Sequence, residues 1–154
     1  MIRRAEIKDI PRIGELLSQV NMVHYKGRPD IFKPGRKYTD RELEEIIGDD
    51  SRPVLVSVDG EGYVEGYAFC VYTCYENSNL MTDIKTLYID DLCVDETLRG
   101  RKIGKGLYEA VVKLAADTRC YNVTLNVWAL NEGAMRFYES CGLKPQKIGM
   151  EFIL

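Results

Sequence analysis

The sequence predicts an α/β protein built on one mixed β-sheet. Short segments rich in β-branched and aromatic residues alternate with segments of helical apolar spacing, and glycines or prolines separate them. The predicted order is strand, helix, helix, strand, strand, strand, helix, strand, helix, strand. The 154 residues are enough for one packed core, so we expect a single domain over residues 1–154.

The N-terminal segments predict a strand, a helix and an irregular connection. Residues 1–7 are strand-like, and residues 9–20 have apolar residues at helical spacing, with Pro11 in the first turn, where proline is tolerated. Residues 21–38 contain two prolines and two glycines. Proline and glycine interrupt regular structure, so we expect an irregular connection there.

The next segments predict a second helix and two strands. Thr39 and Glu42 form a capping-box pattern at the start of a helix over residues 39–50. Residues 53–59 and 63–75 are predicted strands, and the turn sequence Asp-Gly-Glu-Gly joins them.

The C-terminal half predicts two strand–helix pairs and a final strand. Residues 85–95 and 121–129 are strand-like, and each precedes a segment with helical apolar spacing, 104–118 and 131–142. Residues 147–154, with the sequence Lys-Ile-Gly-Met-Glu-Phe-Ile-Leu, are expected to close the sheet as its last strand.

The composition limits the possible function classes. The net charge of −3 argues against a general nucleic-acid binder. No apolar run approaches the ~18–20 residues that a membrane helix needs, and the N-terminal segment lacks the apolar core of a signal peptide. The five cysteines include no Cys-x-x-Cys pair, which suggests neither disulfides nor a metal site. We therefore expect a cytoplasmic protein with reduced thiols and with no metal, nucleic-acid or membrane partner.

The most informative segment is the loop over residues 99–106, Arg-Gly-Arg-Lys-Ile-Gly-Lys-Gly. It places four positive charges and three glycines at the start of the predicted helix 104–118. Glycine lets backbone N–H groups approach a ligand, and a helix N-terminus attracts anions, so the loop predicts a phosphate or pyrophosphate site. The spacing does not fit the nucleotide-triphosphate loop, and Glu109 stands where the dinucleotide loop needs its third glycine.

The remaining pattern, Arg101-x-x-Gly104-x-Gly106, resembles the loop of the GNAT family, the GCN5-related N-acetyltransferases. A second signature of that family, Asn-x-x-Ala-x-x-Phe-Tyr-Glu-x-x-Gly-Phe, is similar to the segment over residues 126–144. Leu143 replaces the phenylalanine that is commonest in the family. The matching residues are Asn131, Ala134, Phe137, Tyr138, Glu139 and Gly142.

This resemblance implies the acyl-CoA N-acyltransferase fold, a mixed, twisted sheet of six to seven strands with about four helices. The fourth and fifth strands, here 84–94 and 121–128, are expected to splay apart and to hold the pantetheine arm of acetyl-coenzyme A between them. Asn131 is expected to cap the last helix, either alone or while it also binds this cosubstrate. The cofactor-binding residues implied are Leu92, Cys93, Val94, Arg99, Gly100, Arg101, Lys102, Ile103, Gly104, Lys105, Gly106, Asn131 and Tyr138.

The reaction implied is direct transfer of an acetyl group from acetyl-coenzyme A to a primary amine of a small molecule or peptide. A free alkylamine has a pKa of about 10.4, so removing its proton at pH 7 costs roughly 4.6 kcal/mol and calls for a base. By similarity to the acidic segment of polyamine-type members, Asp90 is the candidate base. In an unbroken strand only one of Asp90 and Asp91 can face the acceptor, and a β-bulge would blur that choice. Whether Asp90, Asp91 or water takes the amine proton stays open, and either acid could instead bind a cationic substrate or cap a loop.

Tyr138 occupies the family's general-acid position and would stabilise the departing thiolate, mainly as a hydrogen-bond donor. His24, the only histidine, lies in the predicted connection and is a weaker candidate base. The alternative to an enzyme is a non-catalytic sensor that binds acetyl-coenzyme A. The sequence does not identify the amine acceptor, and it leaves open whether the chain forms a homodimer.

Overall fold

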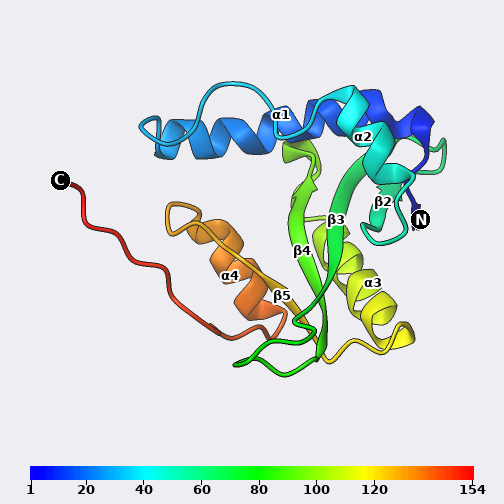
Figure 1. The fold of residues 1–154 in the computed structure, drawn as a ribbon. Coiled ribbons are helices and arrows are strands. Elements are labelled where there is room, and N and C mark those ends of the chain that lie inside the picture. The colour runs from blue at the N-terminus through cyan, green and yellow to red at the C-terminus, as the bar shows by residue number, and fades with distance from the viewer.

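The computed structural model describes residues 1–154 and contains a five-stranded sheet in the order β1-β2-β3-β4-β5 (Figure 1). The strands are β1 (Ile2–Arg4), β2 (Val54–Val58), β3 (Val64–Cys74), β4 (Lys85–Val94) and β5 (Asn122–Leu125). The helices are α1 (Ile10–Gly27), α2 (Asp40–Ile47), α3 (Ile103–Asp117) and α4 (Glu132–Ser140). The first four strands pair antiparallel and β5 pairs parallel with β4, so the predicted mixed α/β sheet is confirmed.

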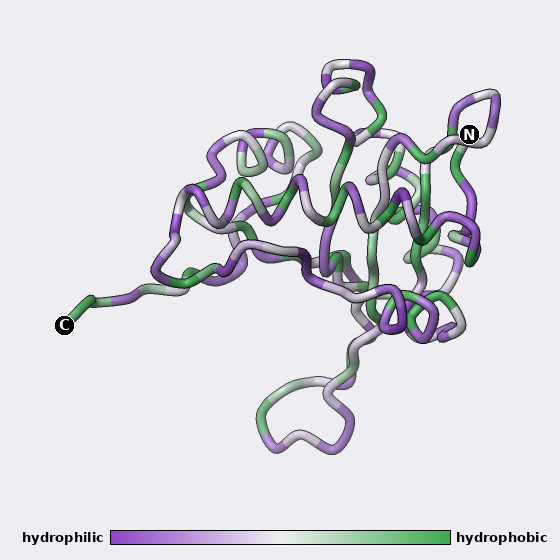
Figure 2. The backbone as a smooth tube through the Cα atoms, turned by 90° about the horizontal axis from the view of Figure 1, so that it is seen from above, coloured by the Kyte–Doolittle hydropathy of each residue, from purple (hydrophilic) through white to green (hydrophobic).

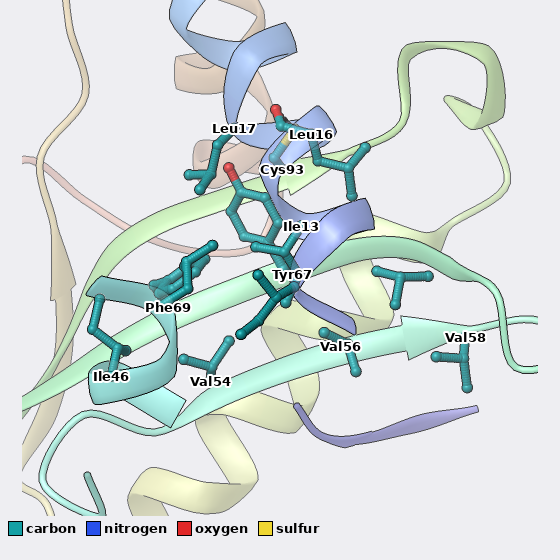
Figure 3. Close-up of a cluster of buried hydrophobic side chains, with 13 residues drawn as sticks. Ile13, Leu16, Leu17, Ile46, Val54, Val56, Val58, Tyr67, Phe69 and Cys93 are labelled. Atoms are coloured by element: carbon teal, nitrogen blue, oxygen red, sulfur yellow. Dashed lines mark hydrogen bonds between the residues drawn. The ribbon is translucent and has the colours of Figure 1, made fainter. Parts of the chain in front are cut away.

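Helices α1 and α2 cover one face of the sheet and α3 covers the other (Figure 1). On the first face, α1 and α2 pack against β2, β3 and the end of β4, around the fully buried ring of Tyr67 (Figure 3). The α3 face is built from Leu107, Val111 and Ala115 against Leu87 and Ile89 of β4. The predicted capping box of α2 is present, since Thr39 accepts from the Glu42 N–H and Glu42 accepts from the Thr39 N–H.

Helix α1 is longer than the sequence predicted. It continues through residues 21–27, which we had expected to be irregular, and ends at Gly27. Pro29 follows the C-cap residue Arg28 and disfavours a helical conformation there, so the predicted irregular connection is present but is confined to residues 28–39. None of the helices is both long enough and apolar enough to cross a bilayer.

A β-bulge interrupts the pairing of β3 with β4. Phe69 lies opposite Asp91 and Cys70 lies opposite Ile89, so Asp90 has no partner in β3. In an unbroken strand Ile89 and Asp91 would share a face. Here Ile89 packs on the α3 side, whereas Asp91 bonds to Tyr67 on the α1 side. The bulge therefore places Ile89 and Asp91 on opposite faces of the sheet.

Strands β4 and β5 pair over a short stretch and then separate. Their register runs from Thr86 opposite Asn122 to Ile89 opposite Leu125. Beyond this point β4 continues to Val94 without a partner on that side. The predicted splay of the fourth and fifth strands is therefore present, and it leaves one edge of β4 open.

The predicted final strand is absent, and the prediction of six to seven strands is wrong. Residues 147–154 form no helix or strand, and the tail over residues 144–154 is exposed throughout. Figures 1 and 2 show this tail leaving the body of the molecule. A strand needs a neighbour for its backbone hydrogen bonds, and no strand of the same chain lies beside the tail.

Candidate active site

A large cleft opens along the side of β4 that β5 leaves free. Its volume is about 2040 Å³. Its walls are the second half of α1, the connection over residues 31–37, the ends of β4 and β5, helix α4 and the tail. Both acids of β4 and Tyr138 line this one cleft, so the structure brings the sequence-predicted Asp90 and Tyr138 together.

The three β4 residues expected to bind the cosubstrate differ in their side chains. Leu92 lines the cleft, Val94 packs against the α3 core, and Cys93 is buried on the α1 face. Burial raises the pKa of the Cys93 thiol to about 12, so the thiol stays protonated near neutral pH. What the open edge offers a ligand is therefore mainly backbone N–H and C=O groups.

The glycine-rich loop joins β4 to α3. Gly100 and Lys102 have positive φ angles of 84° and 63°, and Lys102 is the N-cap residue of α3. Arg99, Gly100, Arg101 and Lys102 are exposed, whereas Ile103 packs against the α3 core and anchors the loop, as expected. No backbone N–H from Arg99 to Lys105 donates to a protein acceptor. The loop thus presents a run of free donors next to exposed positive charges.

Two glycines of α3 lie close to other elements. A Cβ on Gly104 would lie 3.4 Å from Cζ of Phe137 in α4 and 3.5 Å from Cγ2 of Val94, which is ordinary contact distance. A Cβ on Gly106 would lie 3.4 Å from Cδ1 of Ile2. Lys105 points along the helix surface, within 3.8 Å of Glu109. A small side chain at position 104 would therefore fit against α4 and β4. It would obstruct a ligand that approaches the loop.

The start of the loop is fixed by a contact that the sequence did not reveal. Asp95 is buried and accepts from the N–H of Thr97 at 2.8 Å and from its hydroxyl at 2.7 Å. These bonds and the Arg12 guanidinium of α1 lower the pKa of Asp95. Helix α1 is thereby tied to the turn that precedes the basic loop.

Helix α4 carries the other two predicted residues. Asn131 is its N-cap and accepts from the Ala134 N–H at 3.1 Å, which confirms the cap. Tyr138 lies further along the helix, partly buried in the cleft. Its pKa is raised, first by burial and then by the nearby charge of Asp91, so the phenol keeps its proton.

The two acids of β4 have different surroundings. Asp90 accepts from Nζ of Lys37 at 2.9 Å and from the phenol of Tyr38 at 2.5 Å. Both partners come from the connection between α1 and α2. Asp90 is thus engaged by a cation and a hydroxyl through both oxygens of its carboxylate.

Asp91 accepts a single side-chain bond, from the phenol of Tyr67 at 2.9 Å. Burial raises the pKa of Asp91 to about 6, and the hydrogen bond from Tyr67 opposes this rise only in part. This carboxyl therefore titrates close to neutral pH while it lines the cleft.

An aromatic cluster at the cleft also escaped the sequence analysis. The His24 ring stacks on Phe32 with centroids 5.0 Å apart, and Phe32 meets Trp128 edge-on at 4.9 Å. Burial, together with the charge of Lys37, lowers the pKa of His24, so this ring is neutral at physiological pH. The three residues come from α1, the connection and the segment after β5, and no spacing in the sequence signals that they meet.

Comparison with known proteins identifies the family. The family model described as the acetyltransferase (GNAT) family matches residues 21–143. Glucosamine 6-phosphate N-acetyltransferase of Arabidopsis thaliana is 29% identical over 153 residues, which cover 97% of this chain and 93% of that protein. Its crystal structure aligns with a TM-score of 0.71 over 99% of this chain and 97% of that one, at 27% identity.

A second solved structure is more similar in shape. The tetramutant of the BH1408 protein from Bacillus halodurans is 34% identical and aligns with a TM-score of 0.96. The alignment covers 100% of this chain and 99% of that one. The family match covers most of the chain and includes both β4 and the basic loop. The chain belongs to the GNAT family of acetyltransferases.

Proposed function

We propose that this chain transfers the acetyl group of acetyl-coenzyme A to a primary amine of a small molecule. The observation that carries this function is the continuity of one path. Free N–H groups of the loop over residues 99–105 lead to the open edge of β4, and that edge leads to Asp91 and Tyr138 in the cleft. A donor with a phosphate end, an amide-bearing arm and a reactive thioester matches these three parts in order.

The residues present fit this cosubstrate. Arg99, Arg101 and Lys102 would hold the pyrophosphate together with the loop N–H groups, and the edge at Leu92, Cys93 and Val94 would bind the arm through backbone groups. Gly100, Ile103, Gly104, Lys105 and Gly106 complete the loop, and Asn131, which lines the cleft at the start of α4, would be a further contact. Acetyl-coenzyme A would supply the acetyl group as an activated thioester.

We assign to Asp91 the role of the base that removes the proton from the acceptor amine. A base works best when its pKa lies near the working pH, and Asp91 has a pKa of about 6 and one free oxygen. Asp90, the base predicted from the sequence, has both carboxylate oxygens held by Lys37 and Tyr38, so it is less available to accept a proton from the amine. This division departs from the sequence-based choice because the bulge places both acids on the α1–α2 side of the sheet.

Tyr138 would donate a hydrogen bond to the thioester sulfur of acetyl-coenzyme A as that sulfur gains negative charge. Its raised pKa makes complete proton transfer to a thiolate unfavourable, so the hydrogen bond is the main contribution. The protonated, buried state of Cys93 argues against a covalent acetyl-cysteine at that position and supports direct attack by the amine.

The acceptor we propose carries an anionic group beside its amine. Lys33, Lys144 and Lys147 line the cleft and form no ion pair, which leaves positive charge available at the acceptor side. A relative that matches 97% of this chain bears the name glucosamine 6-phosphate N-acetyltransferase. Amino sugar phosphates are therefore the first acceptor class to test. A non-catalytic sensor would need neither the raised pKa of Asp91 nor Tyr138 in the cleft.

Two measurements test this function. Isothermal calorimetry should show tighter binding of acetyl-coenzyme A than of ATP or NAD, and stronger binding of either nucleotide would overturn the assignment. A screen of amines with acetyl-coenzyme A, including glucosamine 6-phosphate and its dephosphorylated form, should release free thiol with at least one amine. Tight binding of acetyl-coenzyme A with no thiol release from any amine would favour the sensor.

A further inference from the structure

The basic loop over residues 99–102 has few contacts of its own with the rest of the protein. All four residues are exposed, and none of their N–H groups donates to a protein acceptor. A loop with so few contacts takes its direction from the segments at its two ends. Ile103, which packs against the α3 core, holds the second end. The first end is held by the turn that follows β4.

This turn is built around the buried carboxylate of Asp95. Its Oδ1 accepts from the N–H of Thr97 at 2.8 Å and from the Thr97 hydroxyl at 2.7 Å. The backbone carbonyl of Asp95 accepts from the N–H of Leu98 at 2.9 Å, and this bond leads the chain into Arg99. The other carboxylate oxygen, Oδ2, accepts from Arg12 of α1. The turn therefore depends on a residue more than eighty positions away in the sequence.

Arg12 uses its whole guanidinium group to make this contact. Its Nε donates to the carbonyl of Val64 at 3.2 Å, its Nη1 to Glu15 at 2.6 Å and its Nη2 to Asp95. The group also lies over the ring of Tyr63, with Cζ 4.7 Å from the ring centre, and the side chain is only 14% exposed. A planar group with donors in fixed directions can satisfy these partners together, whereas the single ammonium group of a lysine cannot.

Helix α1 also holds the same segment at two further places. The thiol of Cys93 donates to the carbonyl of Leu16 at 3.8 Å, and Figure 3 shows these two residues side by side. The side-chain oxygen of Gln19 accepts from the N–H of Glu96 at 3.2 Å. Together with Arg12, these α1 residues follow the i, i+4, i+7 spacing of one helix face. One face of a single helix therefore holds the end of β4 and the turn after it.

We propose that Arg12 is a positioning residue for the cosubstrate: through Asp95, it fixes the direction in which the loop over residues 99–102 presents its N–H groups to the pyrophosphate. This inference rests on the proposed function, which places acetyl-coenzyme A in the loop. Arg12 does not line the cleft, so it acts on the ligand only through the turn. A loop that is already held in the binding direction loses less freedom when the ligand binds. The effect should therefore fall on cosubstrate affinity and not on the acetyl transfer itself.

Calorimetry with acetyl-coenzyme A is the first test. Arg12→Met and Arg12→Lys should both raise Kd by at least about tenfold, because neither side chain can hold Asp95 and the Val64 carbonyl together. An Arg12→Met variant whose Kd stays within about twofold of the wild type overturns the inference and leaves the proposed function standing. Wild-type affinity in Arg12→Lys alone also overturns it, because the charge and not the geometry would then matter. A wild-type chain that binds no acetyl-coenzyme A overturns both.

Arg3→Met is the matched control for loss of stability. Arg3 pairs with Asp9 at 2.7 Å, and Asp9 also accepts from a backbone N–H at 2.8 Å. Asp9 and Asp95 are 4% and 6% exposed, so both substitutions leave a similarly buried carboxylate without its arginine. Neither member of the control pair forms a hydrogen bond or an ion pair with residues 95–106. Arg3→Met should therefore lower the melting temperature as Arg12→Met does, without changing Kd. An equal loss of affinity in the two variants overturns the inference.

A kinetic comparison separates positioning from catalysis. With an amine that accepts the acetyl group, Arg12→Met should raise KM for acetyl-coenzyme A by at least about tenfold and leave kcat at saturation within about threefold of the wild type. A fall in kcat with unchanged KM overturns the inference.

Should Arg12→Met fail to fold, Gln19→Ala gives the answer. This substitution removes only the acceptor of the Glu96 N–H, at the edge of the same helix face. It should raise the Kd of acetyl-coenzyme A by about threefold or more, since a single hydrogen bond to the turn is lost. Unchanged affinity in this variant overturns the inference.

Discussion

The phenol of the fully buried Tyr67 donates to the carboxylate of Asp91 at 2.9 Å, across the bulge where β3 and β4 lose their regular register. This contact joins the core between α1 and the sheet to the wall of the cleft. It holds an acid in surroundings that disfavour its charge, because burial raises the Asp91 pKa to about 6 from a model-compound value of 3.8. Stability and activity should therefore compete at this residue.

Asp91→Asn should stabilise the protein at pH 7. A carboxyl with a raised folded-state pKa binds its proton more tightly in the folded chain, so its contribution is most favourable below about pH 4 and is lost as the pH rises to about 6. The asparagine removes this loss while it can still accept from Tyr67. We expect a gain of about 1–3 kcal/mol at pH 7 and little change at pH 3.5. Urea unfolding at both pH values measures this change in the free energy of unfolding. An equal change at pH 7 and pH 3.5 would exclude the titration of Asp91 as the cause.

The same substitution should lower activity in a pH-dependent manner. Asp91→Asn should reduce kcat/KM by about 10²–10⁴-fold near pH 7, and higher pH should restore part of it because more of the amine is then already neutral. Asp90→Asn should cause a smaller loss with little rescue by pH, since both oxygens of Asp90 are already held by Lys37 and Tyr38. If Asp90→Asn gives the larger loss that is rescued by pH, Asp90 is the base, as the sequence alone indicated.

Gly104→Asp should weaken acetyl-coenzyme A binding by at least about a hundredfold. The new carboxylate would place negative charge among the N–H groups of the loop, and its Cβ fits at ordinary contact distances, so the melting curve should change little. Gly60→Asp, in the turn between β2 and β3, is a matched control because a Cβ there meets nothing within 4 Å. Calorimetry with unchanged affinity for Gly104→Asp would remove the loop from the binding site.

Tyr138→Phe should lower kcat by about 10²–10⁴-fold and leave acetyl-coenzyme A affinity nearly unchanged, because the phenol acts on charge that develops only in the transition state. Tyr121→Phe controls for loss of a hydroxyl, since Tyr121 is 75% exposed. Pre-steady-state thiol release would report the chemical step directly. A drop of less than about threefold in that step would exclude Tyr138 from the mechanism.

Local patterns predicted much of the fold. Helical apolar spacing and the capping residues Thr39 and Asn131 gave helices at the right places, and the splay of β4 from β5 followed from the family resemblance. Three features of the structure could not be predicted from the sequence. Residues 21–27 continue α1, and the break that the prolines predicted comes only at Pro29, after the helix has ended. The position of the bulge, which reassigns Asp90 and Asp91, depends on pairing with β3.

The third feature is the tail. Its alternating residues have strand propensity, but a strand forms only against a neighbour, and propensity does not say whether that neighbour belongs to the same chain. The hydrogen-bond partners of Asp90 and Asp91 could not be predicted from the sequence either. Lys37 and Tyr38 reach Asp90 across 52 or more positions of sequence, and no local spacing encodes that approach.

The aromatic cluster on the cleft wall gives the molecule an intrinsic optical reporter. Trp128 is the only tryptophan of the chain, it is 45% exposed, and its ring lies 4.9 Å from Phe32 and 6.5 Å from His24. Fluorescence excited selectively at the indole therefore comes from one known point, on the cleft wall beside Phe32 and His24. Quenching or a spectral shift on adding a ligand would report occupancy of the cleft near Trp128, and protonation of His24 at low pH would alter the same signal without any ligand.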